Sequence, residues 1–127
     1  MDLIVLTKKY SICKFKNGLP LPEWIYLSDF YSITKTKDEL SIVAEQREPV
    51  SGNIDCNKDW RIIKVVGPLD FSQVGIIAEL SNILKEKKIS IFTISTYDTD
   101  YILVKEKDLK AGIDALRENK HYVFLEK

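Results

Sequence analysis

The alternation of apolar and polar residues divides the chain into short strands and two helical stretches. In the second half, a largely apolar run predicts a strand over Trp60–Val66, and Gly67-Pro68 ends it. Apolar residues then recur at three- and four-residue steps through Ser72–Lys88. This spacing predicts an amphipathic helix, and either Asp70 or Ser72 can cap its first turn.

The rest of the second half predicts three more strands and a second helix. In chain order these are a strand over Ser90–Thr96, an acidic turn over Tyr97–Asp100, a strand over Tyr101–Lys105, a helix from its cap Asp108 to about Glu118 with Asn119 as a left-handed terminator, and a strand over His121–Leu125. The order β-α-β-β-α-β is that of a ferredoxin-like unit. The strands that start at Trp60 and Tyr101 should be central, and those that start at Ser90 and His121 should lie at the edges.

The first half is rich in strand signals and poor in helix signals. Leu3–Leu6 and Tyr10–Phe15 predict a hairpin, and further strands are expected over Phe30–Thr36 and Ser41–Glu45. Between the last two, Lys37–Leu40 can form one helical turn capped by Thr36. The polar, punctuated stretch 48–53 is the best candidate linker. We therefore expect an α+β fold with an N-terminal unit over residues 1–57 and a C-terminal unit over 58–127.

Composition excludes several classes of function. The 127 residues carry 19 basic and 19 acidic side chains, a balance that argues against a nucleic-acid partner and against a polybasic membrane binder. The N-terminus does not resemble a signal peptide, and no apolar run is long enough to span a membrane. Cys13 and Cys56 suit neither a disulfide-dense scaffold nor a metal site. We therefore expect a cytoplasmic protein with reduced thiols.

The start of the first predicted helix is the strongest candidate for a binding site. Its first backbone N–H groups have no partners within the helix, and the helix dipole favours an anion there. Gly75 could let a ligand carboxylate approach these groups, or could merely allow close packing of helix on sheet. Asp70 could cap the helix, accept a ligand ammonium group, or do both.

The turn between the later strands offers further polar groups. Asp98 and Asp100 could accept an ammonium group or a basic side chain, although aspartate is also common in turns for conformational reasons. The hydroxyls of Ser95, Thr96 and Thr99 could contact a ligand or satisfy the turn. Two carboxylates are too few for a hard cation, and no cleft for acid–base catalysis is indicated. We expect His121 at the surface or at a strand end, and expect no catalysis, metal or cofactor.

Several motifs together resemble those of the small bacterial tandem ACT proteins, which are related to the ACT units of aspartate kinases and of the CASTOR amino-acid sensors. The motifs are Gly67-Pro68-Leu69-Asp70-Phe71-Ser72, Gly75-Ile76, Ile89-Ser90-Ile91-Phe92 and, most specific, the run Ser95–Val104. The resemblance covers residues 60–125 closely. It continues more weakly into Thr34–Ser41.

The resemblance implies two tandem ferredoxin-like units, with antiparallel sheets side by side and a small amino acid bound at their interface. The implied ligand residues are Asp70, Phe71, Ser72, Gly75, Ile76, Thr96, Asp98, Thr99 and Asp100, with Ser41 and Ile42 or a second chain completing the site. It further implies a homodimer that regulates another protein without catalysis. The alternative is a module for dimerisation or protein interaction that binds no ligand.

Overall fold

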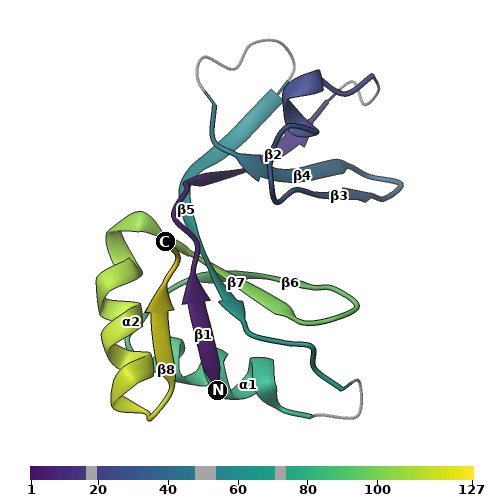
Figure 1. Ribbon diagram of the computed structural model, residues 1–127. Helices are drawn as coiled ribbons and strands as arrows, with labels where there is room; N and C mark the ends of the chain where they lie inside the picture. The colour runs from purple at the N-terminus through teal and green to yellow at the C-terminus, as the bar shows by residue number, and fades with distance from the viewer. Residues whose placement is uncertain (17–19, 48–53, 71–73) are drawn as a thin grey trace. The chain divides into compact units, whose positions relative to one another are not determined.

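The computed structural model describes residues 1–16, 20–47, 54–70 and 74–127, which form two compact units (Figure 1). The helical unit comprises Met1–Thr7 and Arg61–Lys127. The inserted unit comprises Lys8–Trp60. The boundary between Trp60 and Arg61 lies close to the expected boundary between residues 57 and 58. Residues 1–7, however, belong with the C-terminal part of the chain and not with the N-terminal unit. The fold class is α+β, as predicted.

The sheet of the helical unit has the strand order β6–β7–β5–β1–β8 (Figure 1). The strands span Asp2–Val5 (β1), Ile54–Val65 (β5), Ile91–Ser95 (β6), Asp100–Lys105 (β7) and Tyr122–Leu125 (β8). The prediction that β5 and β7 are internal and that β6 and β8 lie at the edges is confirmed. The strand β5 begins at Ile54, before the predicted start, and its first part belongs to the inserted unit.

The predicted hairpin between the first two strands is wrong. β1 pairs antiparallel with β5 and parallel with β8, so that Leu3 lies opposite both Val65 and Val123. Leu3 and Val5 are almost fully buried in the core of the helical unit. A two-residue alternation shows that a segment is a strand but does not identify its partner. The link from β1 to the next strand instead carries the chain from one unit into the other.

Two helices pack on one face of this sheet. They span Ile76–Glu86 (α1) and Leu109–Glu118 (α2), and α1 contributes Leu80 and Leu84 to the core while α2 contributes Leu116. The sheet side of this core consists of alternating residues from four strands: Leu3, Val5, Ile63, Val65, Ile102, Val104 and Val123. The helical spacing in the sequence therefore identified the face that is buried.

The helix ends differ from the prediction. α1 begins at Ile76 and not at Ser72, because Gly75 has a left-handed φ of 81° and interrupts the right-handed helix. Neither helix has a side-chain cap; Asp70 is therefore not the cap, and Ser72 lies outside the described residues. After α2, Asn119 has φ −95°, and Lys120 is the left-handed residue.

The inserted unit has the strand order β3–β4–β2–β5. Its elements span Tyr10–Phe15 (β2), Glu23–Ile25 (a 3-10 helix, η1), Ser32–Lys35 (β3) and Leu40–Glu45 (β4), followed by the first part of β5. The buried core consists of Cys13, Phe15, Ile25, Leu40, Ile42 and Ala44. The described residues of this unit include no α-helix. The expected linker 48–53 lies outside the described residues.

The turn between β3 and β4 is a hairpin turn, so the predicted helical turn over Lys37–Leu40 is wrong. Thr36 donates its N–H to the carbonyl of Glu39 over 2.9 Å, and its hydroxyl accepts the N–H groups of Asp38 and Glu39 at 3.1 Å each. In the helical unit, Thr96 bonds to Thr99 in the same way, through an N–H to carbonyl bond of 2.8 Å. The two units therefore contain the same threonine-centred hairpin.

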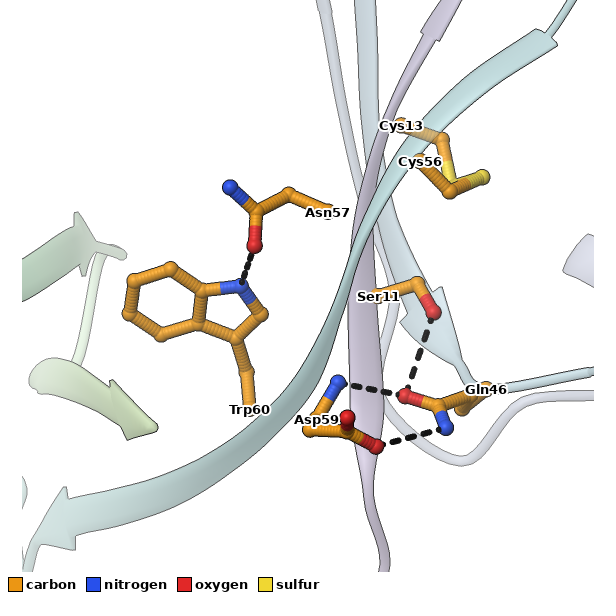
Figure 2. The surroundings of a disulfide bond; sticks show 7 residues. All are labelled: Ser11, Cys13, Gln46, Cys56, Asn57, Asp59 and Trp60. Atoms are coloured by element: carbon orange, nitrogen blue, oxygen red, sulfur yellow. Dashed lines mark hydrogen bonds between the residues drawn. A yellow bond between two sulfur atoms is a disulfide. The ribbon is translucent and has the colours of Figure 1, made fainter. Parts of the chain in front are cut away.

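Cys13 and Cys56 form a disulfide between β2 and β5 (Figure 2), so the expectation of reduced thiols is wrong. The antiparallel register places these two residues directly opposite each other. They are separated by 43 positions in the sequence, and the prediction did not extend β5 back to Cys56. No feature of the sequence alone therefore indicated that they pair.

A β-bulge in β5 lies close to the point where this strand leaves the inserted unit. Tyr10 lies opposite Trp60 and Ile12 opposite Asn57, which leaves one extra residue on β5. Asp59 takes a left-handed φ of 66° at this bulge. The side-chain amide of Gln46 holds it: Asp59 N–H donates to Oε1 over 2.6 Å, and Nε2 donates to the Asp59 carboxylate over 3.0 Å (Figure 2).

Candidate ligand-binding site

A surface cavity of about 330 Å³ lies at the start of α1, beside the β6–β7 turn. The loop after β5, the first helical residues and the turn all contribute to its walls, which are Leu69, Asp70, Gly75, Ile76, Ile77, Ser95, Thr96, Tyr97, Asp98, Thr99 and Asp100. Its volume lies at the lower end of the ~300–1,000 Å³ that is typical of small-molecule sites. All of these residues belong to the helical unit.

Two hydrogen bonds and the close approach of Gly67 hold the end of β5 and the following loop against the turn. Leu69 donates its N–H to the carbonyl of Asp98 over 2.7 Å, and the Thr99 hydroxyl donates to the carbonyl of Val65 over 2.6 Å. A Cβ atom at Gly67 would lie 2.8 Å from the Asp98 carbonyl oxygen, closer than real Cβ contacts allow. The two walls of the cavity are therefore fixed relative to each other by backbone contacts.

Gly75 provides an open approach to the start of α1. Its φ of 81° suits glycine, and an added Cβ would meet no atom within 4 Å. The alternative that Gly75 permits close packing of helix on sheet is therefore wrong. The first helical hydrogen bond is donated by Glu79 to the carbonyl of Gly75, so the N–H groups of Ile76, Ile77 and Ala78 have no acceptor within the helix. These N–H groups and the helix dipole can bind a carboxylate.

The charged side chains that line the cavity are all acidic. Asp70 and Asp98 are exposed, whereas Asp100 is partly buried and accepts the Ser95 hydroxyl at 2.5 Å. Among the described lining residues there is no lysine, arginine or histidine. Within the described residues, no group of three potential metal ligands is close enough to hold a metal ion. The cavity therefore combines an anion-binding helix start with carboxylates that attract cations.

Two of the hydroxyl groups that line the cavity make hydrogen bonds within the protein, one inside the turn and one from the turn to β5. The Thr96 hydroxyl donates to the carbonyl of Thr99 at 3.1 Å and accepts the N–H of Thr99 at 3.3 Å. Thr99 is only 4% exposed, and its hydroxyl bonds to Val65. These contacts support the structural alternative for both threonines. They shape the site and leave the carboxylates and the helix start as its recognition groups.

Seven of the residues proposed from the sequence line the cavity: Asp70, Gly75, Ile76, Thr96, Asp98, Thr99 and Asp100. Phe71 and Ser72 lie outside the described residues. Ser41 and Ile42 are on β4 in the inserted unit, and their part in a ligand site stays a prediction. Leu69, Ile77 and Tyr97 also line the cavity and were not predicted as ligand residues from the sequence. The three-residue step from Ile77 to Leu80 in the predicted helix was the available signal for Ile77.

His121 lies at the start of the last strand, as expected, but it is buried at 6% exposure and is not a surface residue. Its Nδ1 lies 3.2 Å from the amino group of Met1. Its Nε2 lies 2.7 Å from a carboxylate oxygen of Glu79, within ion-pair distance but not aligned as a hydrogen bond. These contacts link the first and last strands to α1, which gives His121 a structural role.

Comparison with known proteins identifies the class. A family model described as the ACT domain matches residues 55–118, and the chain therefore belongs to the ACT domain family. A second model, which describes an N-terminal domain, matches residues 8–51. The two matched segments fall largely in the helical unit and the inserted unit respectively.

Individual relatives fit this assignment. A crystal structure of a protein from Agobacterium tumefaciens is 32% identical with a TM-score of 0.87, and the alignment covers 99% of this chain and 93% of that one. The ligand-free regulatory subunit of aspartate kinase from Thermus thermophilus has a similar fold, with 13% identity, a TM-score of 0.60, and 89% and 93% coverage. The cytosolic arginine sensor for mTORC1 subunit 1 of Rattus norvegicus is 36% identical over 59 residues, which are 46% of this chain and 18% of the sensor.

The chain thus matches less than a fifth of the length of that sensor. By name, the Thermus protein is the regulatory subunit of a kinase and the Rattus protein is an arginine sensor. In the part of the chain that the structure describes, no helix is long and apolar enough to cross a membrane.

Proposed function

We propose that the chain is an amino-acid-binding regulatory module without catalytic activity. The observation that carries this proposal is the cavity where the start of α1 meets three carboxylates. The α-carboxylate of the ligand bonds to the N–H groups of Ile76 and Ile77, where the helix dipole adds roughly half a positive charge. The α-ammonium group pairs with an aspartate on the opposite wall, for which we choose Asp98, an exposed residue of the β6–β7 turn.

The acidity of the cavity favours an amino acid with a cationic side chain. One carboxylate is enough for an α-ammonium group, but the described walls carry Asp70, Asp98 and Asp100 and no basic residue. A second cationic group on the ligand would neutralise this excess. The similarity to a mammalian arginine sensor supports the same choice. Arginine and lysine are therefore the first ligands to test.

The ligand acts by differential binding. It stabilises the arrangement of the β6–β7 turn and helix start that closes around it, and it shifts the population toward that arrangement. The resulting change is transmitted to a partner protein in the cytoplasm. This mechanism requires no reacting group in the cavity, because the output is a change of affinity between proteins.

The test is stabilisation of the helical unit by individual amino acids. Both α-helices of the described residues belong to this unit, so its unfolding in urea can be followed by helical circular dichroism. A ligand at a hundred times its dissociation constant should add ~2.7 kcal/mol. Arginine or lysine should shift the transition of the wild type and of Asp114→Asn, an exposed carboxylate on α2, but should shift Asp98→Asn less. No shift with any amino acid at saturating concentration would refute binding.

A second function, association with another copy of the chain, is favoured by the edge strand β8. Tyr122, Phe124 and Leu125 on this strand are 66%, 54% and 65% exposed. Among the described strands, β8 pairs with β1 alone, and such an edge can pair with a second chain. Sedimentation should show a homodimer that Phe124→Lys dissociates. A monomeric wild type at all concentrations would exclude this association.

A further inference from the structure

We propose that the Cys13–Cys56 pair is a thiol–disulfide exchange site, and that its redox state sets the stability of the inserted unit. The two residues lie opposite each other on β2 and β5, with Cα atoms 4.1 Å apart. They are the two cysteines of the chain, so no other thiol within it competes for either one. The co-reactant is a small thiol of the glutathione class.

The inserted unit depends on this bond because its core is small. The unit contains roughly 50 residues, a size at which a single core is marginal. Its described core has six buried residues, of which Cys13 is one, and the described residues of the unit form no α-helix. The disulfide joins positions 43 apart and therefore restricts most of the unfolded segment. The helical unit contains no cysteine and has a larger buried core.

The exposure of the two residues determines where exchange begins. Cys13 is 4% exposed, whereas Cys56 is only partly buried. The thiolate of a glutathione-class thiol attacks Sγ of Cys56, forms a mixed disulfide there, and releases Cys13 as a thiolate that takes a proton. A second thiol then attacks the glutathione sulfur, which frees the Cys56 thiol and leaves oxidised glutathione. The two electrons that reduce the protein disulfide thus come from two glutathione molecules.

Two spectroscopic signals separate the units in the intact chain. Both tryptophans, Trp24 and Trp60, belong to the inserted unit, whereas the two α-helices that the structure describes belong to the helical unit. Urea unfolding is followed by tryptophan fluorescence and by helical circular dichroism, with and without dithiothreitol. Reduction should lower the fluorescence midpoint by roughly 1 M or more and leave the helical midpoint in place.

A variant without the pair provides the control. In Cys13→Ala/Cys56→Ala, the fluorescence midpoint should match that of the reduced wild type and should not respond to dithiothreitol. A trapping experiment with glutathione followed by mass spectrometry should place the mixed disulfide on Cys56. The proposal is wrong if reduction leaves the fluorescence midpoint unchanged, if it moves both midpoints equally, or if both cysteines stay alkylatable in an oxidising glutathione buffer.

Discussion

The hydroxyl of Thr99 donates a hydrogen bond of 2.6 Å to the backbone carbonyl of Val65, at the end of β5. Thr99 is 4% exposed, so water does not readily replace this bond. Thr99→Val retains the shape of the side chain but leaves a buried carbonyl without its donor. We expect a loss of about 1–3 kcal/mol in the stability of the helical unit, measured by helical circular dichroism in urea.

Thr99→Ser is the matched control, because it retains the hydroxyl and removes one methyl group. It should cost about 1 kcal/mol or less. The loss of the Val65 bond should also release the turn from the loop after β5, so Thr99→Val should bind an amino-acid ligand more weakly than Thr99→Ser. Equal stability of the valine and serine variants would show that the hydroxyl makes no net contribution.

The sequence predicted the helical unit well because its elements are long and periodic. The spacing of Leu80 and Leu84 identified the buried face of α1, and alternation identified the strands that flank the β6–β7 turn. The helix start and the acidic turn were named as separate candidate groups for a ligand at the interface of two units, and in the structure both line one cavity of the helical unit. From the sequence, the Thr99 hydroxyl could contact a ligand or satisfy the turn. Only the structure shows that it bonds to the carbonyl of Val65.

What the sequence could not predict depends on long-range pairing. Leu3 alternates like any strand residue, and nothing local indicates that β1 inserts between β5 and β8. The Cys13–Cys56 bond required the register of β2 on β5, including the early start of β5. Gly75 was proposed either to admit a ligand carboxylate or to allow close packing, and its left-handed φ, with the resulting late start of α1, could be seen only in the backbone itself.

The conformation of Gly75 makes a prediction about two substitutions. Gly75→Ala places a Cβ on a residue with φ 81°, which should cost roughly 1–2 kcal/mol although the surrounding space is open. Gly75→Asn should cost less, because asparagine adopts the left-handed region more readily. Urea unfolding followed by helical circular dichroism measures both. If asparagine proves as costly as alanine, backbone conformation is not the reason for glycine at this position.

The left-handed Asp59 in the β5 bulge predicts a reversal of the usual ranking of alanine and glycine. In the middle of an ordinary strand, a glycine variant is less stable than the corresponding alanine variant. At Asp59, with φ 66°, Asp59→Gly should be more stable than Asp59→Ala by roughly 1 kcal/mol. Both variants lose the side-chain contact with Gln46 equally, so the comparison isolates the backbone. Urea unfolding followed by tryptophan fluorescence gives the difference, and an advantage for alanine would contradict it.

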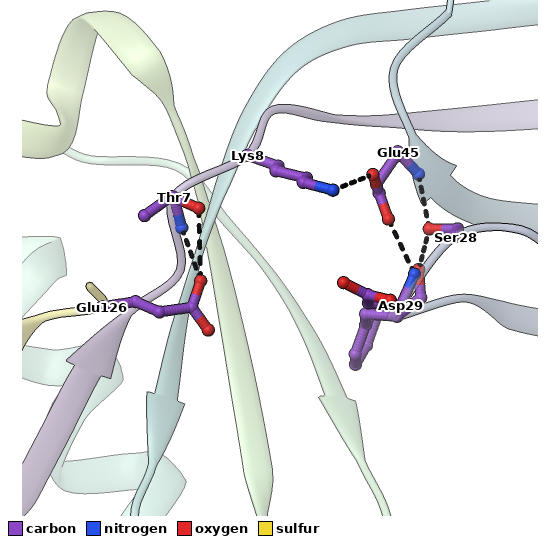
Figure 3. A network of polar contacts seen from close by, with 7 residues as sticks. Thr7, Lys8, Ser28, Asp29, Glu45 and Glu126 are labelled. Atoms are coloured by element: carbon purple, nitrogen blue, oxygen red, sulfur yellow. Dashed lines mark hydrogen bonds and ion pairs between the residues drawn. The ribbon is translucent and has the colours of Figure 1, made fainter.

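Glu45 at the end of β4 is held by three groups of the inserted unit (Figure 3). Its carboxylate lies 3.0 Å from the Lys8 ammonium group and accepts the N–H of Asp29 at 2.7 Å, while its own N–H donates to the Ser28 hydroxyl at 3.0 Å. Burial alone would raise the pKa of Glu45. The contacts of the carboxylate with the Lys8 ammonium group and the Asp29 N–H oppose burial, and the pKa is lowered from its ordinary value of 4.5.

The lowered pKa of Glu45 determines how its contribution to folding stability changes with pH. The folded state favours ionised Glu45, so its contribution is fully present above about pH 4.5 and is lost as the pH falls through the lower folded pKa. Glu45→Gln should cost about 1–2 kcal/mol at neutral pH, because Lys8 is largely exposed and only part of the interaction is protected from solvent. Fluorescence-detected stability of the wild type should converge with that of Glu45→Gln at acid pH. The exposed Glu39→Gln is the control, and a constant difference between wild type and Glu45→Gln across this range would contradict the assignment.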